Sequence, residues 1–202
     1  MVKIKVLNLY AGIGGNREEW NNSLIEVTAV EIDKKIANKY KELFPEDNVI
    51  IADAHEYLLK NYKEYDFIWS SPPCPSHSRT NYFLNSQGKV RYPDMKLWQE
   101  ITFLKTFCKS KWVVENVIPY YDLMFNPKII GRHCIWSNFN ITNIEVKKKT
   151  IGRMNGNRQT ASKKRLEERN KVDSKIGKHI FECAYGIEAN PLKKYMNQEK
   201  TK

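Results

Sequence analysis

A cysteine beside a rigid proline corner is the residue best placed to do chemistry in this sequence. Cys74 lies in SSPPCPSHS, directly after the two prolines that end the apolar run DFIW. Prolines fix φ and lack an N–H, so the chain makes a stiff turn here. A thiol in a polar, partly open loop at the end of a buried strand is typical of a nucleophile rather than of a core cysteine.

Polar residues also follow the other apolar runs of the N-terminal half. Glu31 ends IEVTAVE, Asp53 ends NVIIAD, and Glu115 and Asn116 lie near the end of KWVVENV. The turn AGIGG follows the first run, and its glycines would let a ligand approach backbone amides closely. Ligands bind at the carboxyl ends of parallel strands, so we expect these residues to gather at one edge of a sheet.

The glycine-rich turn and two of the acids favour a cofactor that contains adenosine but no phosphate. A dinucleotide fingerprint needs GxGxxG, and here Arg17 occupies the third glycine position. Glu31 is well placed to accept hydrogen bonds from a ribose, and Asp53 from an adenine amino group. S-adenosylmethionine fits this set.

The elements that must position these residues alternate along the chain. Apolar runs predict strands over 3–10, 25–31, 48–53, 65–73, 111–117 and 132–141. Apolar residues at helical spacing predict helices over 34–44, 55–62 and 95–108, with Asp33 and Asp94 as caps. This alternation predicts an α/β fold with a mainly parallel sheet.

Three further segments carry local signals. Asn16 and Glu19 form a capping-box pattern, which predicts a helix directly after the glycine-rich turn. A charged helix is expected over 161–170. The last apolar segment, KHIFECAYGI, is compatible with either a strand or a docking helix, because its periodicity does not decide between them.

Charge and composition limit the partners. The chain has 202 residues and a net charge of +11, and residues 145–178 carry 12 lysines and arginines against four acidic residues. This excess favours a polyanion partner, with a solvated surface helix as the alternative for the basic block. No run of 18 apolar residues or secretory signal is present, so we expect an intracellular chain without membrane contact. Four well-separated cysteines without a CxxC pair predict neither a metal site nor a disulfide framework.

Five segments, in order and spacing, resemble the DNA (cytosine-5)-methyltransferases. They are LNLYAGIGG, VEID, DA, SSPPCPSHS and VVENV, within about residues 3–120. GRHCIWSNF, which begins at Gly131, is similar to a segment of the short, phage-type (Dcm-like) members. The resemblance implies a Rossmann-like methyltransferase fold with helices on both faces of the sheet. It also implies a catalytic domain over 1–144 and a basic segment over 145–202 as a reduced DNA-recognition element.

The resemblance implies a role for each matching residue. Cys74 would add to C6 of a cytosine flipped out of a DNA duplex, and Glu115 would hold or protonate N3. Asn116 would fix the loop, and Arg132 would contact the base and orient the cysteine. The implied contacts to S-adenosyl-L-methionine are Tyr10, Ala11, Gly12, Gly14, Glu31, Ile32, Asp53 and Pro73. The expected DNA contacts are Ser76, His77, Arg79, Arg153, Arg158, Lys163, Lys164 and Arg165.

Some positions depart from the family pattern. Tyr10 replaces the usual phenylalanine, Asn8 a common aspartate, and Pro75 the glutamine that usually follows the cysteine.

The expected partner is double-stranded DNA, with a short or relaxed target site. The expected location is the cytoplasm of a prokaryote or of a phage-infected host cell, and a restriction-modification context fits. The alternatives are an RNA (tRNA) cytosine-5 methyltransferase and a non-catalytic nucleic-acid-binding protein on the same fold. The sequence leaves the oligomeric state open.

Overall fold

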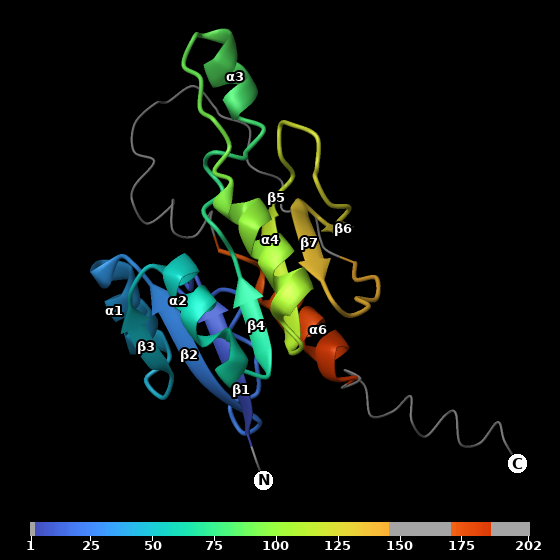
Figure 1. Ribbon diagram of the computed structural model, residues 1–202. Coiled ribbons are helices and arrows are strands. Elements are labelled where there is room, and N and C mark those ends of the chain that lie inside the picture. Colours follow the sequence, from blue (N-terminus) through green and yellow to red (C-terminus); the bar gives the residue numbers. More distant parts are fainter. Residues whose placement is uncertain (1–2, 146–170, 187–202) are drawn as a thin grey trace, which may run out of the picture.

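A single twisted sheet organises the computed structural model, which describes residues 3–145 and 171–186 (Figure 1). The seven strands have the order β3-β2-β1-β4-β5-β7-β6. They are β1 (Ile4–Leu9), β2 (Ile25–Glu31), β3 (Asn48–Ile51), β4 (Phe67–Ser70), β5 (Lys111–Val117), β6 (Lys128–Ile130) and β7 (His133–Ser137). The first five strands are parallel, whereas β7 runs antiparallel to both β5 and β6. The predicted, mainly parallel α/β sheet is confirmed.

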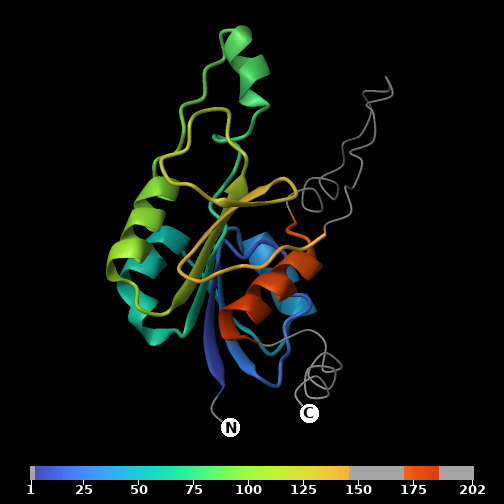
Figure 2. The same cartoon turned by 90° about the vertical axis from the view of Figure 1, so that its right-hand side faces the viewer.

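Helices cover both faces of this sheet, as expected (Figure 2). They are α1 (Lys34–Leu43), α2 (Ala54–Asn61), the 3₁₀ turn η1 (Tyr62–Glu64), α3 (Asn81–Ser86), α4 (Lys96–Phe107) and α6 (Ser174–Tyr185). Leu58 of α2 and Ile101 of α4 pack with Leu7 and Ile68 on one face. The opposite face is covered by α1 and α6. Within the described part of the chain, no helix has the length and apolar character needed to cross a membrane.

The order of the strands creates a switch point between β1 and β4. From β1 the chain builds the sheet outward through β2 and β3, and it then returns to β4 on the other side of β1. Crossovers leave β1 and β4 in opposite directions, which opens a crevice at the carboxyl ends of these strands. The glycine-rich turn follows β1 and the proline corner follows β4, so both lie at this crevice.

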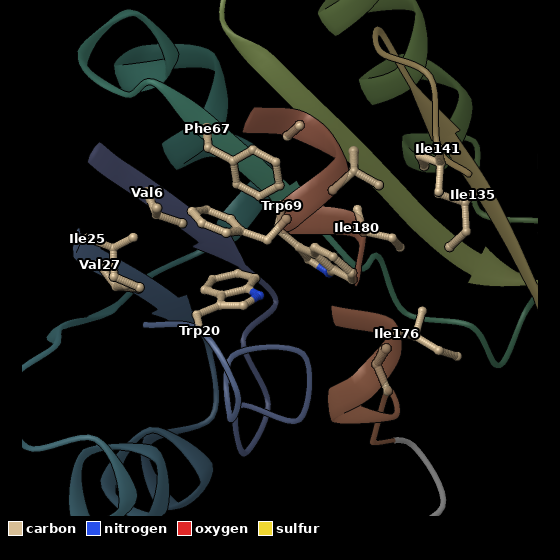
Figure 3. Packing of buried hydrophobic residues seen from close by; sticks show 14 of the residues in the cluster. Val6, Trp20, Ile25, Val27, Phe67, Trp69, Ile135, Ile141, Ile176 and Ile180 are labelled. Atoms are coloured by element: carbon tan, nitrogen blue, oxygen red, sulfur yellow. The ribbon is translucent and has the colours of Figure 1, made fainter. Parts of the chain in front are cut away.

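Helix α6 completes the core from the C-terminal part of the chain. Its Ile176 and Ile180 belong to the same buried cluster as Trp20 and Phe67 (Figure 3). Phe181 of the same helix also belongs to this cluster. The ring centroids of Trp20 and Phe181 lie 5.4 Å apart. The segment KHIFECAYGI is therefore a docking helix up to Tyr185 rather than a strand. Residues 145–202 thus contribute a helix to the core shared with the sheet.

The helix predicted after the glycine-rich turn is wrong. Residues 12–24 form successive turns instead. The side chain of Asn16 does not cap a helix, because its Nδ2 donates to Oδ1 of Asn8 at 2.8 Å in the interior. Helix α6 docks directly on this segment, and Trp20 Nε1 donates to the carbonyl oxygen of Gly177 at 3.1 Å. Tertiary contacts, rather than the local capping pattern, therefore determine the conformation of this segment. The charged helix expected over 161–170 lies outside the described residues.

The Gly177→Ala substitution tests this close approach. A Cβ at position 177 would lie 2.1 Å from the backbone oxygen of Asn16, which cannot rotate away as a side chain could. Alanine is favoured over glycine within a helix by about 1 kcal/mol. Overpacking costs about 1–3 kcal/mol, and a backbone clash belongs at the upper end. We therefore expect the free energy of unfolding, measured in urea, to fall by about 1–2 kcal/mol.

The exposed position Lys178, also on α6, provides the matched control. Lys178→Ala should leave the free energy of unfolding within about 0.5 kcal/mol of wild type, as is usual for surface substitutions. A Gly177→Ala protein that is as stable as wild type would show that α6 does not pack against residue 16.

Candidate active site

The proline corner is anchored to the end of β5. Asn116 Nδ2 donates to the carbonyl oxygen of Pro72 at 2.9 Å. After the corner, the backbone N–H groups of His77 and Ser78 donate to the carbonyl oxygen of Cys74 at 3.0 and 3.1 Å. These bonds fix the backbone on both sides of the cysteine. The loop contact expected of Asn116 is therefore present in the structure.

Charged groups on β5 and in the turn directly before β7 act on the Cys74 thiol. The side chain is half-buried. Burial raises the pKa of this thiol, and the nearby Glu115 carboxylate raises it further, whereas Arg132 acts in the opposite direction. The structure thus brings Cys74, Glu115 and Arg132 together, although they come from distant parts of the sequence. Without a bound substrate the thiol is protonated at neutral pH.

Glu115 is paired with a histidine that the sequence interpretation missed. His133 Nδ1 lies 2.5 Å from Glu115 Oε1, and both side chains are buried. Strands β5 and β7 are antiparallel, and Val117 opposes His133 while Glu115 opposes Ile135. His133 is adjacent to Arg132 in GRHCIWSNF, but the sequence carries no signal for this strand pairing. The histidine fixes the orientation of the carboxylate beside Cys74.

A pocket of about 140 Å³ lies at the switch point. It is lined by Tyr10, Ile32, Asp53, Ala54, Pro72, Pro73, His77, Asp94, Lys96 and Leu97. Four of these residues are among the expected cofactor contacts. Asp94, Lys96 and Leu97, at the beginning of α4, were not expected there.

The acids around this pocket suit a nucleoside. Glu31 Oε2 accepts from the backbone N–H of Gly12 at 3.0 Å, and its Oε1 accepts from Asp33 at 3.0 Å. Each carboxylate oxygen has a second acceptor position for a ribose hydroxyl. A hydrogen bond from the Glu56 backbone lowers the pKa of Asp53, so this carboxylate is ionised and can accept from an adenine amino group.

Two further features of the pocket fit an adenosyl group. Gly12 has φ +55°, and no atom lies within 4 Å of the position of a Cβ there, so the backbone is open to a ligand. Ile32 is 66% exposed although it is a large apolar residue beside the acids, and an adenine ring would cover it. The residues present therefore fit S-adenosylmethionine.

Gly14 and Ala11, also expected as cofactor contacts, have clear structural roles behind the turn. A Cβ on Gly14 would lie 2.3 Å from the ring of Phe44, so the glycine is required for packing on α1. Ala11 is buried against the same helix. Arg17, which interrupts the dinucleotide pattern, forms a buried ion pair with Asp47, in which Nη2 and Oδ1 lie 2.9 Å apart.

Beneath the pocket a buried carboxylate holds three side chains. Glu100 is completely buried on α4 and accepts from Tyr10 Oη at 2.6 Å and from Ser70 Oγ at 2.6 Å. His55 Nδ1 lies 3.0 Å from the same carboxylate, and this hydrogen bond raises the pKa of His55. Glu100 was missed, although its spacing from Leu97 and Leu104 places it on the apolar face of the predicted helix. It fixes Tyr10 at the wall of the pocket.

Removal of Glu100 should destabilise the fold strongly. Glu100→Ala leaves the Tyr10 and Ser70 hydroxyls and a protonated His55 without their buried acceptor. Losing one partner of a buried charged pair costs about 3–5 kcal/mol, and we expect the free energy of unfolding to fall by this amount. The pKa of His55 is higher in the folded protein than in the unfolded chain. Its ion pair with Glu100 therefore stabilises the fold fully at pH values below the pKa of the unfolded chain, and this stabilisation is lost as the pH rises through the pKa of the folded protein.

Urea unfolding at pH 6 and pH 9 measures both effects. The loss caused by Glu100→Ala should be larger at pH 6, where His55 is charged. Glu56→Ala, at an exposed position on α2, is the control and should change stability by less than about 0.5 kcal/mol. A loss below about 1 kcal/mol for Glu100→Ala would contradict the proposed network.

The expected nucleic-acid contacts fall into three groups. Arg79 is exposed and Ser76 half-exposed, next to the segment carrying α3, which projects from the body of the molecule (Figure 1). His77 is only 1% exposed and lines the pocket, so it is not available to a surface phosphate as expected. Arg153, Arg158, Lys163, Lys164 and Arg165 lie outside the described residues.

The fold and the pocket define a class. A parallel sheet with the order β3-β2-β1-β4-β5 and an antiparallel β7, together with an adenosyl-type pocket at its switch point, is the Rossmann-like arrangement of S-adenosylmethionine-dependent methyltransferases. A family model, C-5 cytosine-specific DNA methylase, matches residues 4–118, more than half of the chain. The chain belongs to this family, and its cofactor is S-adenosyl-L-methionine.

Individual relatives cover less of the chain. A tRNA (cytosine(38)-C(5))-methyltransferase from Spodoptera frugiperda is 34% identical over 86 residues, which is 40% of this chain and 26% of that protein. The crystal structure of a Spodoptera frugiperda DNMT2 mutant has 28% identity and a TM-score of 0.41, covering 57% of this chain and 36% of its own. An Agrobacterium tumefaciens SAM-dependent methyltransferase has 18% identity and a TM-score of 0.42, covering 62% and 41%. The chain thus spans about a quarter of the length of its curated relative.

Proposed function

We propose that this chain transfers a methyl group from S-adenosylmethionine to C5 of cytosine in double-stranded DNA. The observation that carries the proposal is the arrangement at the switch point. The Glu115 carboxylate and the Arg132 guanidinium both act electrostatically on the Cys74 thiol, which directly follows Pro73 at the wall of the cofactor pocket. A nucleophile, an acid and a cation near one another are what addition to a pyrimidine ring requires.

Each group has a defined part in the reaction. Cytosine C5 is a poor nucleophile until a sulfur adds to C6. The thiolate of Cys74 forms the C6–S bond while Glu115 supplies a proton or a hydrogen bond to N3, which turns the ring into an enamine. S-adenosylmethionine would supply the electrophilic methyl group for C5 and would leave as S-adenosylhomocysteine. Solvent water then takes the C5 proton, and cleavage of the C6–S bond releases methylated cytosine and the Cys74 thiolate.

Arg132 assists the first step electrostatically. Its charge lowers the pKa of Cys74 against the raising effects of burial and Glu115. The proton that the Cys74 thiol loses can be shared between the Glu115 carboxylate and N3 of the base, and the thiolate is favoured once that carboxylate is neutralised in this way. Addition of sulfur and protonation of N3 then support one another, because each lowers the cost of the other.

RNA is the second candidate substrate. The curated relative that matches part of this chain modifies a tRNA cytosine, and the same chemistry serves both nucleic acids. The excess of positive charge suits either phosphate backbone. DNA remains the leading proposal on the family match over residues 4–118.

A labelled-methyl assay separates the candidates. Radiolabelled S-adenosylmethionine is incubated with the full chain and duplex DNA or a tRNA mixture. Label in the duplex alone supports the proposal, whereas label in tRNA alone overturns it in favour of the RNA activity. Binding to DNA by gel shift without any methyl transfer would indicate the non-catalytic binding protein.

The basic segment is proposed as the recognition element. Residues 145–178 hold most of the excess positive charge and would contact phosphates, while α6 joins the same region to the core. So short an element should give a short or relaxed target site. Bisulfite sequencing of plasmid DNA from expressing cells checks this, and a long strict motif would contradict it.

A further inference from the structure

His77 has a fixed position in the loop that follows Cys74. Its backbone N–H donates to the Cys74 carbonyl oxygen at 3.0 Å, and its own carbonyl oxygen accepts from the N–H of Tyr120 at 3.1 Å. The side chain is 1% exposed. The imidazole is therefore held inside the protein rather than presented to solvent.

A hydrogen bond to Tyr121 sets the tautomer of His77. Its Nδ1 lies 2.5 Å from the hydroxyl oxygen of Tyr121. A tyrosine hydroxyl is the more acidic of these two groups, and the free nitrogen of a neutral imidazole is the more basic. The Tyr121 hydroxyl therefore gives its proton to Nδ1 of His77. In the neutral ring this leaves the proton on Nε2, which becomes a donor.

That donor has no partner in the protein. Nε2 of His77 is buried and makes no hydrogen bond. Burying an unsatisfied donor costs about 1–3 kcal/mol, so such atoms in folded proteins usually mark a ligand or an ordered water. His77 lines the switch-point pocket together with Asp53, Pro72 and Leu97.

We infer that the Nε2–H of His77 donates a hydrogen bond to an acceptor atom of the adenosyl group, a ribose oxygen or a purine ring nitrogen. The inference rests on the proposed function, which places S-adenosylmethionine in this pocket. A phosphate of the nucleic acid is a poorer partner. The ring is buried, and this burial lowers its pKa and keeps it uncharged. His77 is thus a cofactor-binding residue in the loop of the nucleophile.

Calorimetric titration of the full chain with S-adenosylmethionine and with S-adenosylhomocysteine tests the inference. His77→Phe keeps an aromatic ring but has no donor, and its Kd for both ligands should rise about fivefold to tenfold, the usual worth of one neutral hydrogen bond. His77→Gln retains an N–H donor and should stay closer to wild type. His179→Phe, on α6 and away from the pocket lining, is the control and should bind like wild type.

Tyr121→Phe gives an independent readout. Without the hydroxyl nothing fixes the tautomer, so cofactor affinity should fall although His77 is unchanged. Nitrogen-15 spectra of the imidazole should show the Nε2-protonated form in wild type, with its Nε2–H resonance shifted by S-adenosylhomocysteine. This readout does not depend on catalysis, and a merely structural role would not produce the shift.

The outcomes separate this inference from the proposed function. Wild type that binds neither ligand would overturn both. Wild type that binds them while His77→Phe binds equally well would overturn only the inference, as would a ring protonated on Nδ1. Unchanged cofactor affinity with weaker binding of duplex DNA would assign His77 to the nucleic acid instead. Circular dichroism confirms that each variant is folded.

Discussion

Replacing Cys74 by serine is expected to abolish methyl transfer. Serine has nearly the shape of cysteine, so the proline corner and its bond from Asn116 should be retained. A hydroxyl at this position is a far weaker nucleophile than a thiolate. Removal of the nucleophile in a covalent mechanism typically costs roughly 10⁴-fold or more in turnover. Incorporation of labelled methyl groups into duplex DNA measures the loss.

Trapping on duplex DNA that contains 5-fluorocytosine gives a second measurement. Fluorine at C5 cannot leave as a proton does, so wild type should form an adduct that survives denaturation and requires the cofactor. Cys74→Ser should form none. Cys108→Ser, at the C-terminal end of α4, is the matched control, because that thiol donates to the carbonyl oxygen of Ser110 and does not line the cofactor pocket. A Cys74→Ser protein within tenfold of wild type would remove the nucleophile from the proposed mechanism.

The environment of Cys74 also predicts how alkylation of its thiol depends on pH. Burial and the neighbouring Glu115 raise the pKa of Cys74, so at neutral pH only a small fraction is thiolate. Below that pKa the thiolate fraction grows tenfold per pH unit. Alkylation of Cys74 by iodoacetamide should therefore rise steadily from pH 6 to pH 9.

Replacing Glu115 by glutamine should change two observables in opposite directions. Methyl transfer should fall by about 10²–10⁴-fold, the usual contribution of a positioned acid, because N3 loses its proton donor. The Cys74 thiol should become more acidic and more reactive towards iodoacetamide at pH 7, because the neighbouring negative charge is gone. A glutamine oxygen can still accept from His133, so the fold should be preserved.

A fall in methyl transfer together with a rise in thiol reactivity distinguishes a chemical role of Glu115 from a structural one. A variant that had merely disturbed the site would lose both activity and thiol reactivity, or would change neither. Glu26→Gln, at an exposed position on β2, removes the same charge away from the thiol and should affect neither observable. A Glu115→Gln protein with normal methyl transfer would contradict the role proposed for this carboxylate.

Much of the catalytic half was predictable from the sequence, because its signals are local. The strand ending at Glu31, the helix capped by Asp33 and the strand that carries Glu115 are formed by residues close together in the chain. Parallel strands place their carboxyl ends at one edge, so the meeting of Cys74 with Glu115 followed from the alternation of elements. The elements α3 and β6 were missed because they are short, with six and three residues.

Tertiary structure decided what local patterns could not. The capping box at Asn16 is a valid helix signal, yet the segment forms turns because α6 approaches it from more than 150 residues away. The pairing of Glu115 with His133 depends on the register of an antiparallel strand, and the Glu100 network depends on how α4 packs on β1 and β4.

Periodicity and capping therefore determined which strands and helices carry the chemistry and where their active ends lie. The packing of the two helical layers on the sheet determined which side chains became partners. The physical reason is that burying a polar group without a hydrogen-bond partner costs free energy. Buried polar groups therefore pair with one another even when they are far apart along the chain.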